Sequence, residues 1–286
     1  MNIKFLLLFC IIGFQLFTNS CKANQEQKTQ EKIIEKINYY TKKIKLEPDS
    51  NVNYELRGDY YSELKKYDLA LQDYYKANTI REGAFTYFGI AKVELILGHN
   101  EKALQAISKS IELQPQTRNA YRLRGLCYDF LNIDKNAIKD YTEFLEPNSK
   151  VQIIAAEKEV FLLLYVRRAM ILLRNNNYKA ALDDINISIM IDKKSEDKNY
   201  NLYYIRYLIY DAMNKKAEAK EDLLTALKMG FTIEKKLNLI RQKYTGEEKI
   251  EIENLIKKYV SKPMDKEFDY ENHQYIVETF FKENEE

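Results

Sequence analysis

Residues 51–83 read NVNYELRGDYYSELKKYDLALQDYYKANTIREG, and residues 84–117 read AFTYFGIAKVELILGHNEKALQAISKSIELQPQT. Aligned on Ala70 and Ala103, the two stretches share an aromatic residue at position 4, a small residue at position 8 and a large residue at position 24. Residues three or four apart lie on one face of a helix, so positions 4, 8 and 11 form one stripe. The pattern therefore predicts a repeating pair of packed helices.

The same pattern recurs three more times toward the C-terminus. Aligned on the Ala at position 20, five repeats, numbered 1 to 5 from here on, begin at Asn51, Ala84, Arg118, Leu162 and Tyr200. These starts are 33, 34, 44 and 38 residues apart. Position 4 is Tyr in every repeat, and position 8 is small in all but repeat 5, where Tyr207 stands. The chain is therefore expected to be a helical array.

The repeat resembles the tetratricopeptide repeat, a pair of antiparallel helices with a period of 34 residues. The resemblance implies an all-α fold, an α-solenoid of about five helix-turn-helix repeats over residues 51–233. Small residues at positions 8 and 20 let the two helices of a repeat approach closely. Stacked pairs of this kind form an extended concave surface for a partner.

Composition argues against several other classes of protein. Eight Gly and four Pro in 286 residues are too few for a β-sandwich or barrel, which needs frequent turns. A formal net charge of +2 gives no general reason to bind nucleic acid. Two His and three Cys leave little material for a metal site, so we expect no metal and no cofactor.

An Arg and an Asp recur together in four of the five repeats, at positions 7 and 23. In repeat 2 both are replaced, by Ile90 and Ala106. An isolated pair could be catalytic, but a pair that is present in four repeats and replaced as a unit in repeat 2 indicates structural ion pairs between the helices of a repeat. The predicted pairs are Arg57 with Asp73, Arg124 with Asp140, Arg168 with Asp184, and Arg206 with Asp222.

The N-terminus has the pattern of an export signal. Lys4 precedes an apolar run from Phe5 to Phe17, which is short for a membrane span and fits residues 1–20 as a signal peptide. The end of the run resembles a bacterial lipoprotein signal, which implies a lipidated Cys21, although Thr18 departs from the usual aliphatic residue. Secretion with a free Cys21 and an uncleaved anchor stay open.

The remaining flanks are assigned from local patterns. We expect residues 21–30 to form a tether, residues 31–50 an N-terminal helix, and residues 234–286 C-terminal capping helices. Thr245-Gly246-Glu247-Glu248 resembles a capping box that opens a helix to about Tyr259. Cys127 aligns with apolar residues of the other repeats, so we interpret it as a small buried residue rather than a nucleophile.

The resemblance also implies a partner groove, lined by positions 2, 5, 9, 12 and 13 of each first helix. An alternative is that the C-terminal helices or the extra segments cover part of it. Glu55 and Asp59 stand where chaperone-binding members carry Lys and Asn, which argues against a carboxylate clamp. The predicted groove residues are Glu55, Asp59, Phe85, Phe88, Lys92, Arg122, Leu126, Phe130, Val166, Met170 and Tyr204.

The sequence thus favours a non-catalytic adaptor that binds a peptide or helix of other cell-envelope proteins. The expected location is the bacterial envelope, lipid-anchored at the outer membrane, since Lys22 stands where some inner-membrane lipoproteins have Asp. The alternative is a lipoprotein that carries a small ligand or glycan. An enzyme using Glu55, Asp59 and Glu63 is disfavoured, because glycosidase carboxylates flank the scissile bond from opposite sides.

Overall fold

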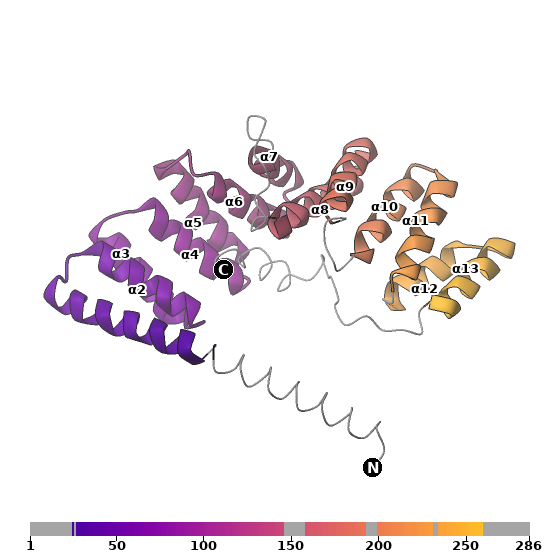
Figure 1. Ribbon diagram of the computed structural model, residues 1–286. Coiled ribbons are helices and arrows are strands. Elements are labelled where there is room, and N and C mark those ends of the chain that lie inside the picture. The colour runs from indigo at the N-terminus through magenta and orange to yellow at the C-terminus, as the bar shows by residue number, and fades with distance from the viewer. Residues whose placement is uncertain (1–24, 26, 146–157, 193–198, 231–233, 260–286) are drawn as a thin grey trace, which may run out of the picture. The chain divides into compact units, whose positions relative to one another are not determined.

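The structure is a computed structural model that describes residues 25, 27–145, 158–192, 199–230 and 234–259. Every regular element within these ranges is a helix (Figure 1). The chain divides into two compact bodies, an N-terminal body of Met1–Ala120 and a C-terminal body of Tyr121–Glu286. Each body is described by itself below.

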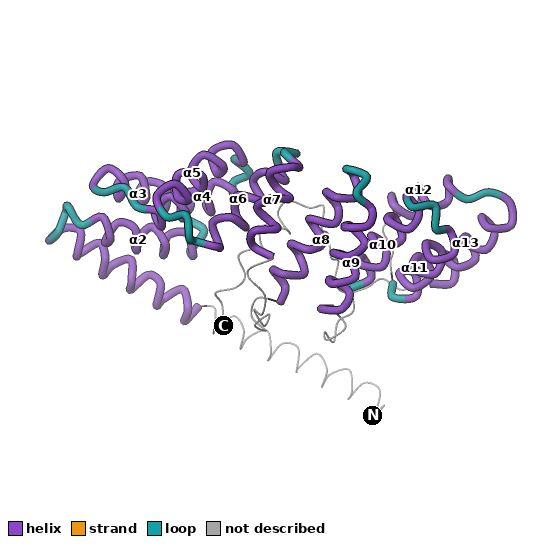
Figure 2. The backbone as a smooth tube through the Cα atoms, turned by 90° about the horizontal axis from the view of Figure 1, so that it is seen from above, coloured by secondary structure: helices purple, strands orange, loops and turns teal. Residues whose placement is uncertain are grey.

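The N-terminal body is a helix over residues 27–46 followed by two helical hairpins. The helices of repeat 1 pack on each other, as do those of repeat 2, and the second helix of repeat 1 also packs on the first helix of repeat 2. Short loops join them (Figure 2). The helices are α2 (Asn51–Glu63), α3 (Tyr67–Ile80), α4 (Ala84–Ile96) and α5 (Asn100–Leu113).

The C-terminal body begins within the first turn of α6 and holds nearly all of repeats 3 to 5 and two further helices. Its paired helices pack as α8 on α9 and α10 on α11, and α13 packs on both α11 and α12. The helices are α6 (Arg118–Phe130), α7 (Asp134–Leu145), α8 (Lys158–Arg174), α9 (Tyr178–Asp192), α10 (Tyr200–Ala212), α11 (Lys216–Lys228), α12 (Glu234–Lys243) and α13 (Gly246–Tyr259).

The turn inside every hairpin has the same backbone conformation. Position 15 of each repeat is left-handed, with φ between 55° and 78°. The next amide donates to the carbonyl five residues earlier at 2.8–2.9 Å, as in the Schellman motif that ends many helices. Gly and Asn tolerate this conformation best. The five left-handed residues are Lys65, Gly98, Asn132, Asn176 and Asn214.

The contact between the two helices of a hairpin depends on which residues occupy positions 8 and 24. Where position 24 is Tyr, position 8 is Gly: a Cβ added to Gly58 would lie 2.8 Å from Tyr74 Cε1, and one added to Gly125 would lie 2.8 Å from Tyr141 Cδ1. Where position 24 is Ile, position 8 is Ala, as with Ala91 in α4. In these repeats a larger residue at position 24 thus accompanies a smaller residue at position 8, which balances volume across the helix contact.

The structure brings together all four predicted Arg/Asp pairs. In each, Nε and one terminal nitrogen of the guanidinium donate to the two carboxylate oxygens at 2.6–2.8 Å, with the Asp side chain at most 6% exposed. These hydrogen bonds raise the pKa of Arg57, Arg124 and Arg206. Tyr rings at positions 4 and 11 flank the guanidinium of Arg57 with ring centroids 5.8 Å away.

Three of these Arg side chains also bind the preceding helix. A second terminal nitrogen donates from Arg57 to Thr41 Oγ1 at 3.1 Å, from Arg168 to Thr142 Oγ1 at 2.9 Å, and from Arg206 to Asn186 Oδ1 at 2.8 Å. Thr142 and Asn186 occupy position 25 of repeats 3 and 4. A hydrogen-bonding side chain at this position was the overlooked sequence signal for a contact with the next repeat. Each such Arg therefore joins its own hairpin to the helix before it.

The predicted all-α fold of helix-turn-helix repeats is confirmed over the described residues. Asn51, Ala84, Arg118 and Tyr200 are the first residues of their helices, whereas α8 begins at Lys158, one turn before the predicted Leu162. The extra segment expected between repeats 3 and 4 falls mainly in residues 146–157, which lie outside the described ranges. Among the helices that are described, none combines the length and apolarity needed to cross a membrane.

Candidate partner-binding surface

Seven predicted or adjacent groove positions of repeats 1 and 2 lie on α2 and α4. Phe85 is 65% exposed and Val52 is 52% exposed, so large apolar side chains face solvent here. Asp59 and Glu63 are also exposed, and the other three are partly exposed. The α2/α4 surface, as we name it, consists of Val52, Glu55, Asp59, Glu63, Phe85, Phe88 and Lys92.

Buried hydroxyl groups hold two of its carboxylates in place. Thr86 Oγ1 donates to Glu55 Oε2 at 2.6 Å, and Tyr74 OH donates to Asp59 Oδ1 at 2.6 Å. Both donors are almost entirely buried, at 0% and 2% exposed. Burial and the nearby Asp59 carboxylate raise the pKa of Tyr74, so its hydroxyl stays a proton donor. The core of the body therefore fixes the orientation of both acids.

Electrostatic coupling shows that the charged groups of this surface act on one another. Partial desolvation and the neighbouring Glu55 raise the pKa of Asp59, while the hydrogen bond from Tyr74 and the ammonium of Lys92 lower it. Desolvation and Asp59 raise the pKa of Glu63, again against Lys92. Three carboxylates against one ammonium leave the surface negative.

Four predicted groove residues are buried, which corrects their assignment. Leu126 and Val166 are 0% exposed, Arg122 is 5% exposed and Tyr204 is 6% exposed. Packing takes the place of partner contact at these positions: the Arg122 guanidinium lies 5.6 Å from the ring centroid of Phe144, for example. Position in the repeat predicted the face of the helix but not what covers it.

Tyr204 is buried because the C-terminal helices pack on repeat 5. Its ring belongs to a core cluster with Leu237 and Ile240 of α12 and with Ile252 and Ile256 of α13. In repeat 5, therefore, the C-terminal helices cover the predicted groove residue Tyr204, as the alternative interpretation expected.

An ion pair adds to the same contact between α10 and α12. Lys243 of α12 pairs with Asp211, which occupies groove position 12 of repeat 5. Its ammonium also lies 5.9 Å from the ring centroid of Tyr207, the bulky residue at position 8. Tyr207, the departure from the repeat pattern, is thus part of the contact with the C-terminal helices.

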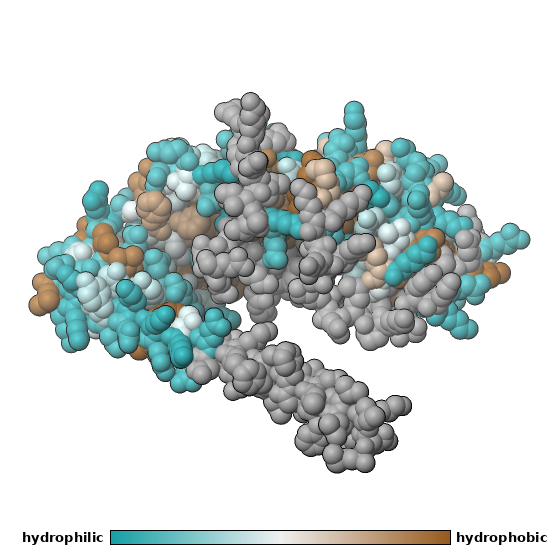
Figure 3. Space-filling model, in the orientation of Figure 1, coloured by the Kyte–Doolittle hydropathy of each residue, from teal (hydrophilic) through white to brown (hydrophobic). Residues whose placement is uncertain are grey.

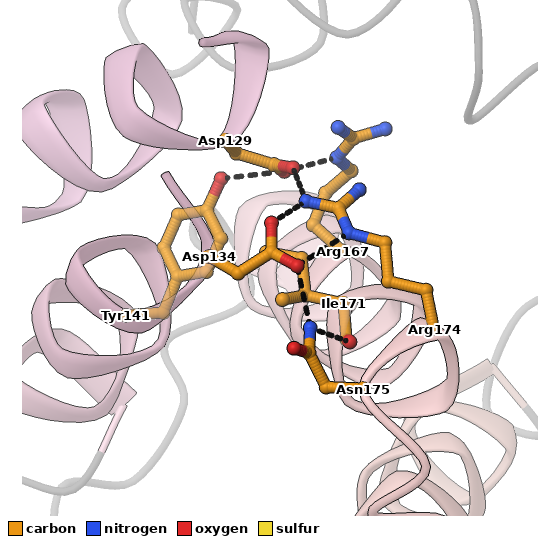
Figure 4. Close-up of polar contacts among 7 residues, drawn as sticks. All are labelled: Asp129, Asp134, Tyr141, Arg167, Ile171, Arg174 and Asn175. Atoms are coloured by element: carbon orange, nitrogen blue, oxygen red, sulfur yellow. Dashed lines mark hydrogen bonds and ion pairs between the residues drawn. The ribbon is translucent and has the colours of Figure 1, made fainter. Parts of the chain in front are cut away.

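Phe130 and Met170 are partly exposed, and Phe130 lies beside a polar network that sequence reasoning missed. Figure 4 shows Asp129 of α6 meeting Tyr141 of α7 and two Arg side chains of α8. Its carboxylate is buried and accepts from Tyr141 OH at 3.1 Å and from Arg167 Nε at 2.7 Å. The Arg167 guanidinium lies 5.7 Å from the ring centroid of Phe130.

The network continues to the tip of the α6–α7 turn. Arg174 pairs with Asp134 and reaches Asp129 at 3.5 Å, and the Asn175 amide also donates to Asp134. Donors therefore surround both carboxylates (Figure 4). This arrangement joins repeat 3 to the first helix of repeat 4 and is that of a structural contact.

A second missed contact lies in repeat 2. Glu94, the polar residue at position 11, is 2% exposed. Its carboxylate contacts His99 Nδ1 at 2.7 Å and accepts from Tyr75 OH at 3.4 Å. The signal for this contact in the sequence was an acid at a position that is apolar or aromatic in the other repeats.

Cys127 lies in the core, as a packing role requires. It is 0% exposed, and desolvation raises the pKa of its thiol to about 12. A thiol nucleophile needs a lowered pKa and access to substrate. Within the described ranges, no group of three or more His, Cys, Asp or Glu side chains is arranged to hold a metal ion. Cys21 and the predicted signal peptide lie outside these ranges.

A family model described as the tetratricopeptide repeat matches residues 53–83 and 86–117. These segments correspond to α2–α3 and α4–α5, the hairpins that form the α2/α4 surface. These two segments carry tetratricopeptide repeats. A search of curated protein sequences finds no match.

Solved structures extend the likeness of fold beyond those two repeats. YrrB, described as a TPR protein with an unusual peptide-binding site, gives a TM-score of 0.58 at 18% identity, covering 66% of this chain and 91% of that one. The C-terminal part of a TPR repeat-containing protein from Cytophaga hutchinsonii gives 0.55 at 14% identity, covering 80% and 90%. MamA gives 0.54 at 17% identity, covering 64% and 92%. At such identities the likeness concerns the fold.

Proposed function

We propose that this chain is a non-catalytic adaptor that binds a partner protein through the α2/α4 surface. The observation that carries the proposal is the exposure of Phe85 and Val52 on adjacent first helices. Apolar side chains exposed next to charged ones are typical of the centre and rim of a binding surface. Figure 3 shows separate apolar patches among hydrophilic side chains on the N-terminal body.

The rest of the predicted groove supports the same choice of surface. Leu126, Val166 and Tyr204 occupy groove positions but are buried, and α12 and α13 pack on repeat 5. A partner would have to displace packed side chains there, whereas Phe85 is available without any rearrangement. The described peptide-binding site of YrrB, a protein of similar fold, is consistent with a peptide or helix as the bound element.

Site-specific photo-crosslinking tests the adaptor function. A photoreactive phenylalanine analogue at Phe85 should crosslink a distinct protein, which is then identified, purified and titrated against the wild-type chain. The matched control carries the analogue at Leu69, an apolar residue of α3 that is 40% exposed. We expect Phe85→Glu to weaken the purified complex at least about tenfold. The same proteins at both sites, or none at either, would contradict the adaptor and favour the small-ligand or glycan alternative.

We further propose that the adaptor is exported and held in the bacterial envelope, at the outer membrane, by lipid on Cys21. The support is the sequence pattern of residues 1–21, and its partners would then be other envelope proteins or peptides. Cys21→Ala should abolish fatty-acid labelling, whereas Cys127→Ala should retain it. Labelling that persists without Cys21 would refute the anchor and leave the adaptor proposal untouched.

A further inference from the structure

The α2/α4 surface has an apolar part and an acidic part. Its apolar part lies in the first turn of each helix, where Val52 and Phe85 occupy position 2 of their repeats. Its acidic part follows along α2, where Glu55, Asp59 and Glu63 stand one turn apart. A segment laid across both helices would therefore meet apolar side chains first and carboxylates next.

The acidic part keeps acceptor capacity for an incoming cation. Thr86 donates to one oxygen of Glu55, and Tyr74 donates to one oxygen of Asp59. A carboxylate offers about four lone-pair sites on its two oxygens, so one hydroxyl leaves room for further donors. Because buried donors orient these acids, little conformational freedom is lost when a ligand binds them.

The charges of the surface do not balance. Lys92 is the cation that acts on both Asp59 and Glu63, against three carboxylates. Partial desolvation is the main cause that raises the pKa of both acids, and repulsion from a neighbouring carboxylate adds to it. The hydrogen bond from Tyr74 lowers the pKa of Asp59, and Lys92 lowers the pKa of both. A cationic group placed here would relieve that repulsion.

We propose that the α2/α4 surface binds a peptide segment that carries Lys or Arg beside a large apolar residue. The apolar side chain contacts Val52 and Phe85, and the cation contacts the acids of α2. This assignment rests on the proposed adaptor function and adds the chemistry of the partner to it. An acidic segment would be repelled by the same charges.

Binding of synthetic peptides to the purified protein tests the assignment. The probes are short peptides of one length in which Leu or Phe neighbours Lys, Arg, Gln or Glu, screened on an array and measured in solution by fluorescence polarisation. We expect Leu/Lys and Phe/Arg peptides to bind, their Gln analogues to bind at least about tenfold more weakly, and added salt to weaken the cationic peptides most.

Matched variants locate the binding. Glu63→Gln, an exposed change, should weaken the Lys peptide about tenfold and flatten its salt dependence, while Phe85→Ser should weaken Lys and Gln peptides alike. Lys92→Met should strengthen binding of the Lys peptide several-fold. Glu101→Gln, an exposed acid of α5, is the control and should change nothing. Thermal unfolding of each variant shows whether it is folded.

The outcomes separate this inference from the proposed function. Bound peptides without enrichment in Lys or Arg, or an unchanged affinity in Glu63→Gln, would overturn the cationic assignment while leaving the surface as an adaptor site. Failure of every peptide to bind at millimolar concentration would also overturn it, even where a protein is crosslinked at Phe85. Absence of any crosslinked protein would remove the adaptor function itself.

Discussion

The α2–α3 and α4–α5 hairpins share a left-handed residue in the turn but differ in chemistry at several positions. Positions 7 and 23 hold Arg57 and Asp73 in the first hairpin, and the apolar Ile90 and Ala106 in the second. Position 8 is Gly58 against Tyr74 in the first and Ala against Ile in the second. Position 15 is Lys in the first and Gly in the second, both left-handed.

The comparison separates what the fold needs from what the surface needs. The α4–α5 hairpin pairs its helices with buried Ile90 and Ala106 where α2–α3 has an ion pair, so the charges are not required to pair two helices. Tyr74 carries a hydroxyl group, which Ile107 lacks. This hydroxyl reaches beyond the contact between the two helices and donates to Asp59 on the α2/α4 surface. The chemistry of repeat 1 therefore links the core to the candidate binding surface.

Breaking the ion pair of α2–α3 should have the largest effect on stability. Asp73→Ala leaves the guanidinium of Arg57 partly buried without its carboxylate, and we expect the free energy of unfolding to fall by about 3 kcal/mol. Arg57→Ile with Asp73→Ala copies the pair of α4–α5 and should cost less than half as much, because no charge is left unpaired. Chemical denaturation of the three proteins measures both values.

A second arm of the same experiment removes Arg57 alone. The two single losses should add to more than the loss in the double variant, since the residues contact each other. Additive losses would contradict a coupled ion pair and would reopen a separate role for each residue.

Filling the space beside Tyr74 should have the next largest effect. Gly58→Ala places a Cβ 2.8 Å from Tyr74 Cε1, and the ring cannot retreat because it also lies close to Gly89 on α4. We expect a net loss of about 1–2 kcal/mol by denaturation, although Ala normally favours a helix over Gly.

A second substitution that copies the α4–α5 hairpin should rescue the stability of the Gly58→Ala variant. Tyr74→Ile in the Gly58→Ala background reproduces the Ala91–Ile107 contact and should recover most of the stability. It should also weaken the cationic peptide, because Asp59 loses its hydroxyl donor. A Gly58→Ala protein as stable as the wild type would show that the helices of repeat 1 can separate freely.

Removing His99 tests the contact that Glu94 makes at position 11 of the α4–α5 hairpin. Glu94 is buried where the first hairpin has Tyr61, and His99 Nδ1 is its nearest partner at 2.7 Å. We expect His99→Ala to cost about 1–2 kcal/mol, since a buried acid loses a hydrogen-bond partner. In a Glu94→Leu background the same change should cost almost nothing. An equal cost in both backgrounds would assign the effect to the turn rather than to the acid.

The spacing of small and aromatic residues was enough to predict the hairpins and the Arg/Asp partners. Both depend on contacts within one repeat, where positions 7 and 23 face each other whenever two helices pair. Contacts between neighbouring elements were not predictable in the same way. Thr41 with Arg57 is one example, and the Asp129 network is another, because each joins residues from different repeats or flanks.

Burial of the predicted groove could not be derived from repeat position. The pattern puts Phe85 and Tyr204 on the same face of their helices, yet one is 65% exposed and the other is 6% exposed. The difference arises because α12 and α13 pack against repeat 5, and their sequences carry no repeat pattern that would place them. The sequence therefore predicted candidate groove positions, and the structure selected among them.

Relaxing the turn of α2–α3 should have the smallest effect, and in the opposite direction. Lys65 is left-handed with φ 58°, whereas Gly98 at the same place in α4–α5 takes this conformation without a Cβ penalty. Lys65→Gly should raise the free energy of unfolding by about 0.5–1 kcal/mol, and Gly98→Lys should lower it by a similar amount. Lys66→Gly, at the next residue of the turn, is the control; its φ is not positive, so added backbone freedom should make it neutral or destabilising. If Lys65→Gly were destabilising too, the Lys side chain would have to make a contact worth more than the strain that its backbone carries.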